Sequence, residues 1–166
     1  MNFSVQFLFM GVILGILLVC IPISKADDDI PLDLIDCKKV MARIAKRTLK
    51  AFGNCTKELR ANVTGNRDEF EKKLGCAVRC TLFRMELLDE QGQVTKDRVQ
   101  KFMDDMVPQD AHEFGHVLTA DCNESYGAKL DMGQEYCESY SEYAQCMQGT
   151  LADFADKTHC HPGPVG

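Results

Sequence analysis

Apolar side chains recur at helical spacing along most of the chain. The segment between Thr95 and Pro108 shows the pattern most clearly, because polar residues separate apolar ones at i, i+3, i+4, i+7 and i+8: Val99, Phe102, Met103, Met106 and Val107. Such spacing predicts an amphipathic helix, with Thr95 as its N-cap and Pro108 as its end.

Four other stretches predict helices or the turns between them. Residues 31–52 predict a long first helix that begins at Pro31 and that Gly53 ends or bends, and residues 63–74 predict a turn followed by a short helix. Gly92 is the expected turn residue of the loop at 88–94. Two further sets of apolar residues each fall on one face of a predicted helix. The first set is Ala111, Phe114, Leu118 and Cys122. The second, within 131–154, is Tyr136, Tyr140, Tyr143, Met147, Leu151 and Phe154. Since alternating patterns of strand length are missing, we predict an all-α fold.

The N-terminal segment has the composition of a secretory signal. An uncharged apolar run extends from Phe7 to Ile23, and small residues follow at Ser24 and Ala26. We therefore predict a signal peptide at 1–26, cleaved after Ala26, followed by a single domain at 27–166. The protein would be secreted and extracellular, without membrane insertion after cleavage. Only the terminal amine precedes the run as a positive charge, so an uncleaved membrane anchor is the alternative.

Charge and cysteine content narrow the class of protein. The formal net charge of −6 argues against a nucleic acid or an anionic membrane surface as partner. The chain has nine cysteines, and removal of Cys20 with the signal peptide leaves an even number in a short exported chain. This is the expected signature of a disulfide framework.

Spacing restricts which cysteines can pair. On one helix, Cys76 and Cys80 would lie roughly 40° apart around the axis and about 6 Å apart along it. A bond between them would need distorted dihedral angles, so we expect each to bond a different element. On a helix through 131–154, Cys137 and Cys146 would face opposite sides and could not meet.

Six cysteines have a spacing that resembles the signature of insect odorant-binding proteins. Three residues separate the second from the third and eight separate the fifth from the sixth: Cys55, Cys76, Cys80, Cys122, Cys137 and Cys146. The stretch "CTLFRMELLDEQGQVTKDRVQKFMDDM" is similar to the family's segment after its third cysteine. The resemblance covers about Lys38 to Phe154, although the interval between Cys55 and Cys76 is somewhat short for the family.

The resemblance implies a fold and a disulfide pairing. The fold is a compact bundle of about six helices, stapled by disulfides, around an internal apolar cavity. Its bonds would be Cys55–Cys80, Cys76–Cys137 and Cys122–Cys146, and the simplest completion adds Cys37–Cys160. In the alternative, Cys37 is the family's first cysteine and Cys55 pairs with Cys160.

The resemblance also implies a function: non-covalent carriage of small hydrophobic molecules such as odorants, pheromones or lipids. It implies no cofactor and no enzymatic activity, and it allows a membrane chemoreceptor as a further partner of a monomer or weak homodimer. A scavenger of amines or lipids from the same superfamily, without an olfactory role, would look similar. Side chains expected to line the cavity are Phe83, Met85, Leu88, Phe102, Met103, Met106, Phe114, Leu118, Tyr140, Tyr143, Met147 and Phe154.

One motif points to a different chemistry. His112, Glu113 and His116 form an H-E-x-x-H arrangement, which resembles the active-site helix of zinc metallopeptidases. Thr119 and Cys122 stand where the longer form of that motif has glycine and a third histidine, and the patterning supplies no β-sheet. We therefore expect no catalytic residues and no metal site, and take both histidines as partly exposed and solvated. A further alternative is that their protonation in acid loosens the bundle and releases the ligand.

Overall fold

Six α-helices make up the part of the chain that the computed structural model describes, residues 34–63 and 67–161. In order they are α2 (Leu34–Asn62), α3 (Arg67–Lys72), α4 (Leu74–Arg84), α5 (Lys96–Met106), α6 (His112–Ser125) and α7 (Glu138–Thr158), with single 3-10 turns η1 (Gln109–Ala111) and η2 (Gly127–Lys129). Between Leu88 and Val94 there is an isolated antiparallel bridge, but the described residues form no strand. The all-α prediction is confirmed, whereas the predicted signal peptide and the start at Pro31 lie outside the described residues.

The most strongly patterned helix has the predicted ends. The Thr95 side chain accepts a hydrogen bond from the backbone N–H of Arg98, which caps the first turn of α5. The helix ends at Met106, two residues before Pro108. Local sequence signals alone therefore place α5 correctly.

The prediction that Gly53 ends the first helix is wrong. α2 continues through Gly53 to Asn62 as a helix of 29 residues. A Cβ at Gly53 would meet nothing within 4 Å, so no tertiary contact requires a glycine there. One glycine costs a helix only about 1 kcal/mol, which its well-patterned neighbours offset.

The start of the last helix also differs from the prediction. α7 begins at Glu138, and Cys137 before it has the left-handed φ of 56°. Residues 131–137 form a loop in which the Asp131 carboxylate accepts the backbone N–H of Gly133 at 2.8 Å. Tyr136 consequently does not share a helical face with Tyr140, and the argument that Cys137 and Cys146 lie on one helix fails.

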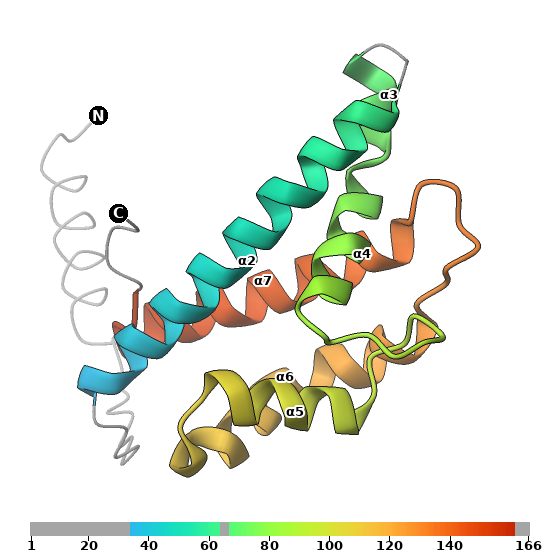
Figure 1. Cartoon of the computed structure of the whole chain (residues 1–166). Helices are drawn as coiled ribbons and strands as arrows, with labels where there is room; N and C mark the ends of the chain where they lie inside the picture. The colour runs from blue at the N-terminus through green and yellow to red at the C-terminus, as the bar shows by residue number, and fades with distance from the viewer. Residues whose placement is uncertain (1–33, 64–66, 162–166) are drawn as a thin grey trace, which may run out of the picture. The chain divides into compact units, whose positions relative to one another are not determined.

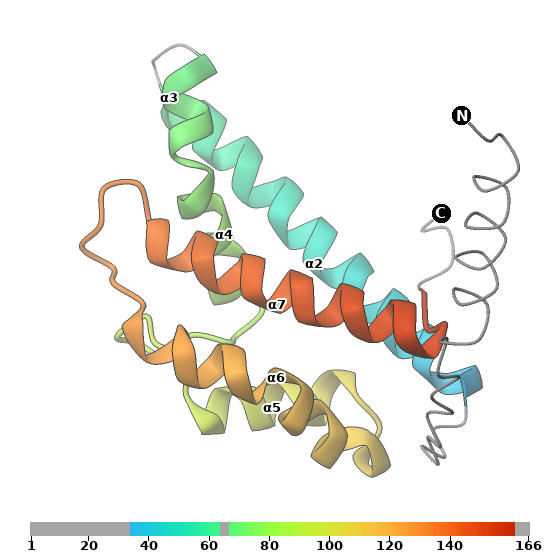
Figure 2. The ribbon, with the colours of Figure 1, turned by 180° about the vertical axis from the view of Figure 1, so that it is seen from behind.

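α4 lies between the first and last helices, as Figures 1 and 2 show. It packs against α2 on one side and α7 on the other, while α6 packs on α7 and α5 on α6. The buried core at this meeting point consists of Leu82, Leu88, Cys122, Leu130, Cys137, Tyr140 and Tyr143. None of the helices in residues 34–63 and 67–161 is long and apolar enough to cross a bilayer.

Four disulfides connect the helices or the residues next to them, three in the pairing that the family resemblance implies and the fourth as the expected completion. They are Cys37–Cys160, Cys55–Cys80, Cys76–Cys137 and Cys122–Cys146, with Cα–Cα distances between 5.1 Å and 6.0 Å. The alternative pairing of Cys55 with Cys160 is contradicted. α4 holds two of these cysteines, which bond it to both of its neighbours, as their helical spacing predicted.

Candidate functional site

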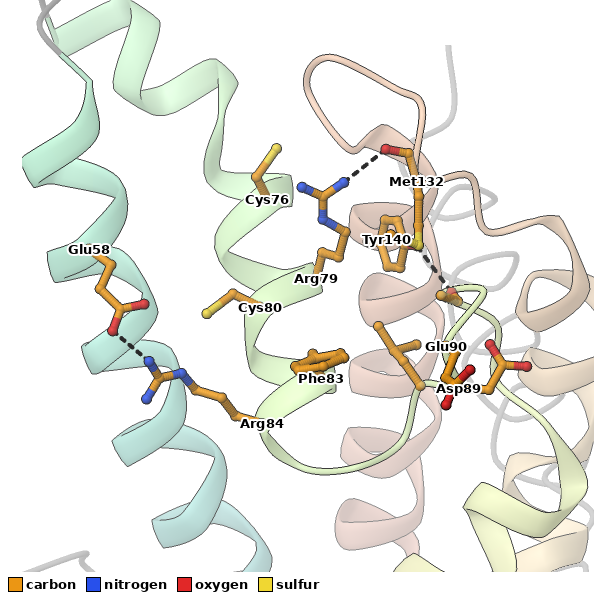
Figure 3. Close-up of a pocket in the computed structure, with 12 residues that line it drawn as sticks. Glu58, Cys76, Arg79, Cys80, Phe83, Arg84, Asp89, Glu90, Met132 and Tyr140 are labelled. Carbon is orange, nitrogen blue, oxygen red and sulfur yellow. Dashed lines mark hydrogen bonds and ion pairs between the residues drawn. The ribbon is translucent and has the colours of Figure 1, made fainter.

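A cleft of about 550 Å³ lies against α4, and Figure 3 shows the side chains around it. This volume falls within the range of small-molecule sites in proteins. The lining residues come from α2, α4, the turn at 88–92, the loop before α7 and α7 itself: Glu58, Cys76, Arg79, Cys80, Phe83, Arg84, Leu88, Asp89, Glu90, Gly92, Met132 and Tyr140.

The cleft combines buried and exposed apolar side chains. Leu88 and Tyr140 are buried, whereas Phe83 is 65% exposed and Met132 is 51% exposed. The Tyr140 hydroxyl donates to the carbonyl oxygen of Gly92 at 3.0 Å, which joins α7 to the turn. Large exposed apolar side chains beside a cavity provide surface that a hydrophobic molecule can cover.

Gly92 holds the turn against the cleft. Its φ is +75°, and a Cβ on it would lie 2.6 Å from Met132 Sδ and 2.7 Å from Tyr140 Oη. Only glycine combines this backbone conformation with such a close approach. The predicted turn residue is therefore confirmed, and it shapes the cleft.

Charged groups around the cleft have partners from distant parts of the sequence. The Arg79 guanidinium lies 5.9 Å from the centroid of the Tyr140 ring, and its Nη1 donates to the Met132 carbonyl oxygen at 3.0 Å. Arg84 Nη2 pairs with Glu58 Oε1 at 2.5 Å. Sequence reasoning missed these residues. Their contacts join positions 26 and 53 residues apart, and contacts over such separations leave no periodic pattern in the sequence.

Three of the twelve predicted lining residues meet at this cleft: Phe83, Leu88 and Tyr140. Four others are buried in the packing of the helices: Met85, Met103, Met106 and Tyr143. The remaining five are half-buried on α5, α6 and α7: Phe102, Phe114, Leu118, Met147 and Phe154. The central cavity implied by the family resemblance stays a prediction, as does the role of these nine residues in it.

Aromatic contacts connect the helices that carry this second group. The rings of Phe114 on α6 and Phe154 on α7 have centroids 5.1 Å apart with a tilt of 49°. Gly115 lies close to Met103 of α5, since a Cβ on Gly115 would be 2.8 Å from Met103 Cε. α6 is thus in contact with α5 on one side and α7 on the other, and the two phenylalanines still expose part of their surface.

Tyr143 makes a polar contact inside this group. Its hydroxyl donates to Asn123 Oδ1 at 2.9 Å, and Asn123 in turn donates to the Thr119 hydroxyl at 3.2 Å. Burial raises the pKa of Tyr143 to about 12. A hydrogen bond from Tyr143 to a ligand would require this bond to be exchanged.

We expect the protein to lose stability between pH 10 and pH 12. Below pH 10, Tyr143 is protonated in both states; above it, the unfolded chain releases the proton while the folded state retains it up to a pKa of about 12. The free energy of unfolding should therefore fall by about 3 kcal/mol across this window. Urea titrations of wild-type protein and Tyr143→Phe measure the effect, and parallel pH profiles for the two proteins would contradict it.

The two histidines of the H-E-x-x-H motif bond to other parts of the fold. His112 Nε2 lies 2.9 Å from the Val107 carbonyl oxygen, and His116 Nε2 lies 2.8 Å from Gln100 Oε1 on α5. Among the residues that the structure describes, no three His, Cys, Asp or Glu side chains form a group that could hold a metal ion. The zinc metallopeptidase alternative therefore finds no support.

A comparison with sequence models of protein families gives one match, the PBP/GOBP family, over residues 35–150. The match includes all six cysteines of the predicted signature and the helices from α2 to the middle of α7. Searches among curated proteins and among solved structures found no match. The match and the disulfide-linked helices agree with each other.

Proposed function

Because the chain belongs to the PBP/GOBP family, the insect odorant-binding proteins, we propose that it is a secreted carrier of small hydrophobic molecules. Members of this family bind and carry ligands and are not enzymes. The observation that carries the proposal is the family match over residues 35–150. Three of the four disulfides have the pairing that the family resemblance implies, and Cys37–Cys160 is an additional bond. Odorants, pheromones and lipids are the ligand classes that the family offers.

Half-buried apolar side chains support binding between α5, α6 and α7. Phe114, Leu118 and Phe154 keep surface in contact with water although they lie beside neighbouring helices. Burial of such surface by a ligand contributes about 25 cal/mol per Å² before the costs of association are subtracted. Methionine side chains nearby can adapt to ligands of several shapes. The ligand would occupy this region, and the cleft at Phe83 is the second candidate position.

The disulfides make an open interior compatible with a stable fold. Each bond lowers the conformational entropy of the unfolded chain and typically contributes 2–4 kcal/mol. Four such bonds can offset apolar contacts that a ligand-free interior leaves unmade. A carrier of this kind does not need its ligand in order to fold.

A fluorescent dye that brightens in apolar surroundings, N-phenyl-1-naphthylamine, tests the proposal directly. The chain contains no tryptophan, so the background emission is low. Wild-type protein should bind the dye, and Phe114→Ala should weaken binding by about tenfold, since an aromatic contact and its buried area are lost. Val117→Ala is the matched control, because Val117 lies on the same helix and is 71% exposed.

The outcomes separate the two candidate positions. Loss of affinity in Phe83→Ala, with Phe114→Ala unchanged, would place the ligand in the cleft against α4. No binding of the dye or of displacing long-chain alcohols by correctly oxidised wild-type protein would refute the carrier function.

A further inference from the structure

Positive charge gathers where α2, α4 and α5 meet. Glu86 lies two residues after the end of α4 and has a left-handed φ of 60°, and its carboxylate pairs with Lys101 Nζ on α5. Arg98 lies one turn before Lys101 on α5, and Arg47 faces α5 from α2. We call this set of Arg47, Glu86, Arg98 and Lys101 the basic junction.

Arg47 has an unusually weak hydrogen-bond partner. Its Nη1 donates to the Sδ atom of Met106 at 3.2 Å, and Met106 is 3% exposed. A thioether is a poor, neutral acceptor, whereas a guanidinium is always charged and fits oxygen anions with several donors. Among the described residues, no carboxylate lies within ion-pair distance of this half-buried arginine.

Thr48, the residue after Arg47, also donates a hydrogen bond to a methionine sulfur. Thr48 Oγ1 donates to the Sδ atom of Met85 at 3.4 Å, and Met85 is also buried. Two consecutive positions of α2 thus direct donors at methionine sulfur rather than at oxygen. An oxygen acceptor brought by a ligand would be the stronger partner for either donor.

The charges of the basic junction do not balance. Lys101, Arg47 and Arg98, in that order, all lower the pKa of the Glu86 carboxyl, so all three cations act on one place. Three cations thus act on the Glu86 carboxylate, although the chain as a whole carries −6. Lys101 already pairs with Glu86, but Arg47 and Arg98 are half-buried, and an incoming anion would offset the cost of removing such charges from water.

We propose that Arg47 and Arg98 bind the anionic head group of the ligand, and that the preferred ligands are amphipathic long-chain carboxylates. This inference rests on the proposed carrier function and names its ligand class. The carboxylate would bond to the Arg47 guanidinium in place of the Met106 sulfur, with Arg98 contributing a second charge. The apolar chain would lie against Met106 and continue toward the neighbouring methionine, Met103.

Dodecanoate and dodecanol test the proposal, since they share a chain and differ in the head group. Competition with the bound dye below the micelle concentration gives both dissociation constants. Wild-type protein should prefer the acid by about tenfold, and Arg47→Gln should abolish the preference by weakening binding of the acid much more than binding of dodecanol. Arg43→Gln is the matched control, because Arg43 is an exposed arginine one turn earlier on α2.

Each outcome decides a different question. Equal affinities of wild-type protein for acid and alcohol would overturn the anion site and leave the carrier function intact, whereas binding of neither would refute both. If Arg47→Gln fails to fold, Arg98→Gln should lower the acid-to-alcohol ratio by several-fold, and an unchanged ratio would refute the proposal. Arg47→Lys should retain part of the preference, because charge remains while the bidentate geometry is lost.

Discussion

Replacement of Cys37 and Cys160 by alanine is expected to lower the free energy of unfolding by about 4 kcal/mol. The bond joins positions 123 residues apart and closes the longest loop of the four. Since the other three bonds already constrain the unfolded chain, the effective loop is shorter than this separation, and the effect is correspondingly smaller than the maximum. Alanine is chosen because both cysteines are buried and a serine hydroxyl would need a partner.

Urea denaturation of the double variant provides the measurement. Mass spectrometry without reducing agent is the control, because the variant must retain the other three disulfides. We expect unchanged helical circular dichroism at low urea and a lower midpoint. A midpoint equal to that of wild-type protein would show that this bond does not constrain the unfolded chain as its sequence separation implies.

Gly75→Ala should destabilise the protein by about 3 kcal/mol, although the same change usually stabilises a helix. A Cβ at position 75 would lie 2.6 Å from the carbonyl oxygens of both Tyr136 and Cys137 and 2.8 Å from Ser141 Oγ. Two of the three atoms belong to the backbone, so a rotamer change cannot remove the clash. The start of α7 would have to move, and the Cys76–Cys137 bond next to it resists that movement.

Gly149→Ala is the control for this substitution. Gly149 is an exposed residue in α7, and a Cβ there would meet nothing within 4 Å. This variant should gain up to about 1 kcal/mol from the lower entropy of its unfolded chain. A loss of stability in Gly75→Ala together with a gain in Gly149→Ala would establish that Gly75 of α4 lies against the backbone before α7. A gain of stability in both variants would contradict this packing.

Much of the helical structure follows from short-range patterns. The Thr95 cap, the stop before Pro108 and the Gly92 turn all depend on local signals, and the structure has each of them. The start of α7 was missed because Tyr136 continues the apolar spacing of the helix after it. The better signal was the Asp131-Met132-Gly133 sequence, where an aspartate can accept the backbone N–H two residues on.

The site was less predictable than the helices. Tyr140 could be identified as a candidate because it lies on the apolar stripe of a predicted helix. Leu88 could be identified because it is an apolar residue at the start of the predicted turn. The partners of Arg79, Arg84 and Arg47 could not, since each is contributed by another element brought near by packing and disulfides. A charge that is half-buried looks, in the sequence, the same as one on a solvated helical face.

The bond between Cys37 and Cys160 has a mechanical consequence. Both cysteines lie near the ends of the described residues, and every described helix from residue 38 onward lies between them along the chain. A force applied to the two termini would pass through this covalent bond and bypass those helices. In a single-molecule pulling experiment, the oxidised domain should therefore not lengthen by helix unfolding until a reductant is added.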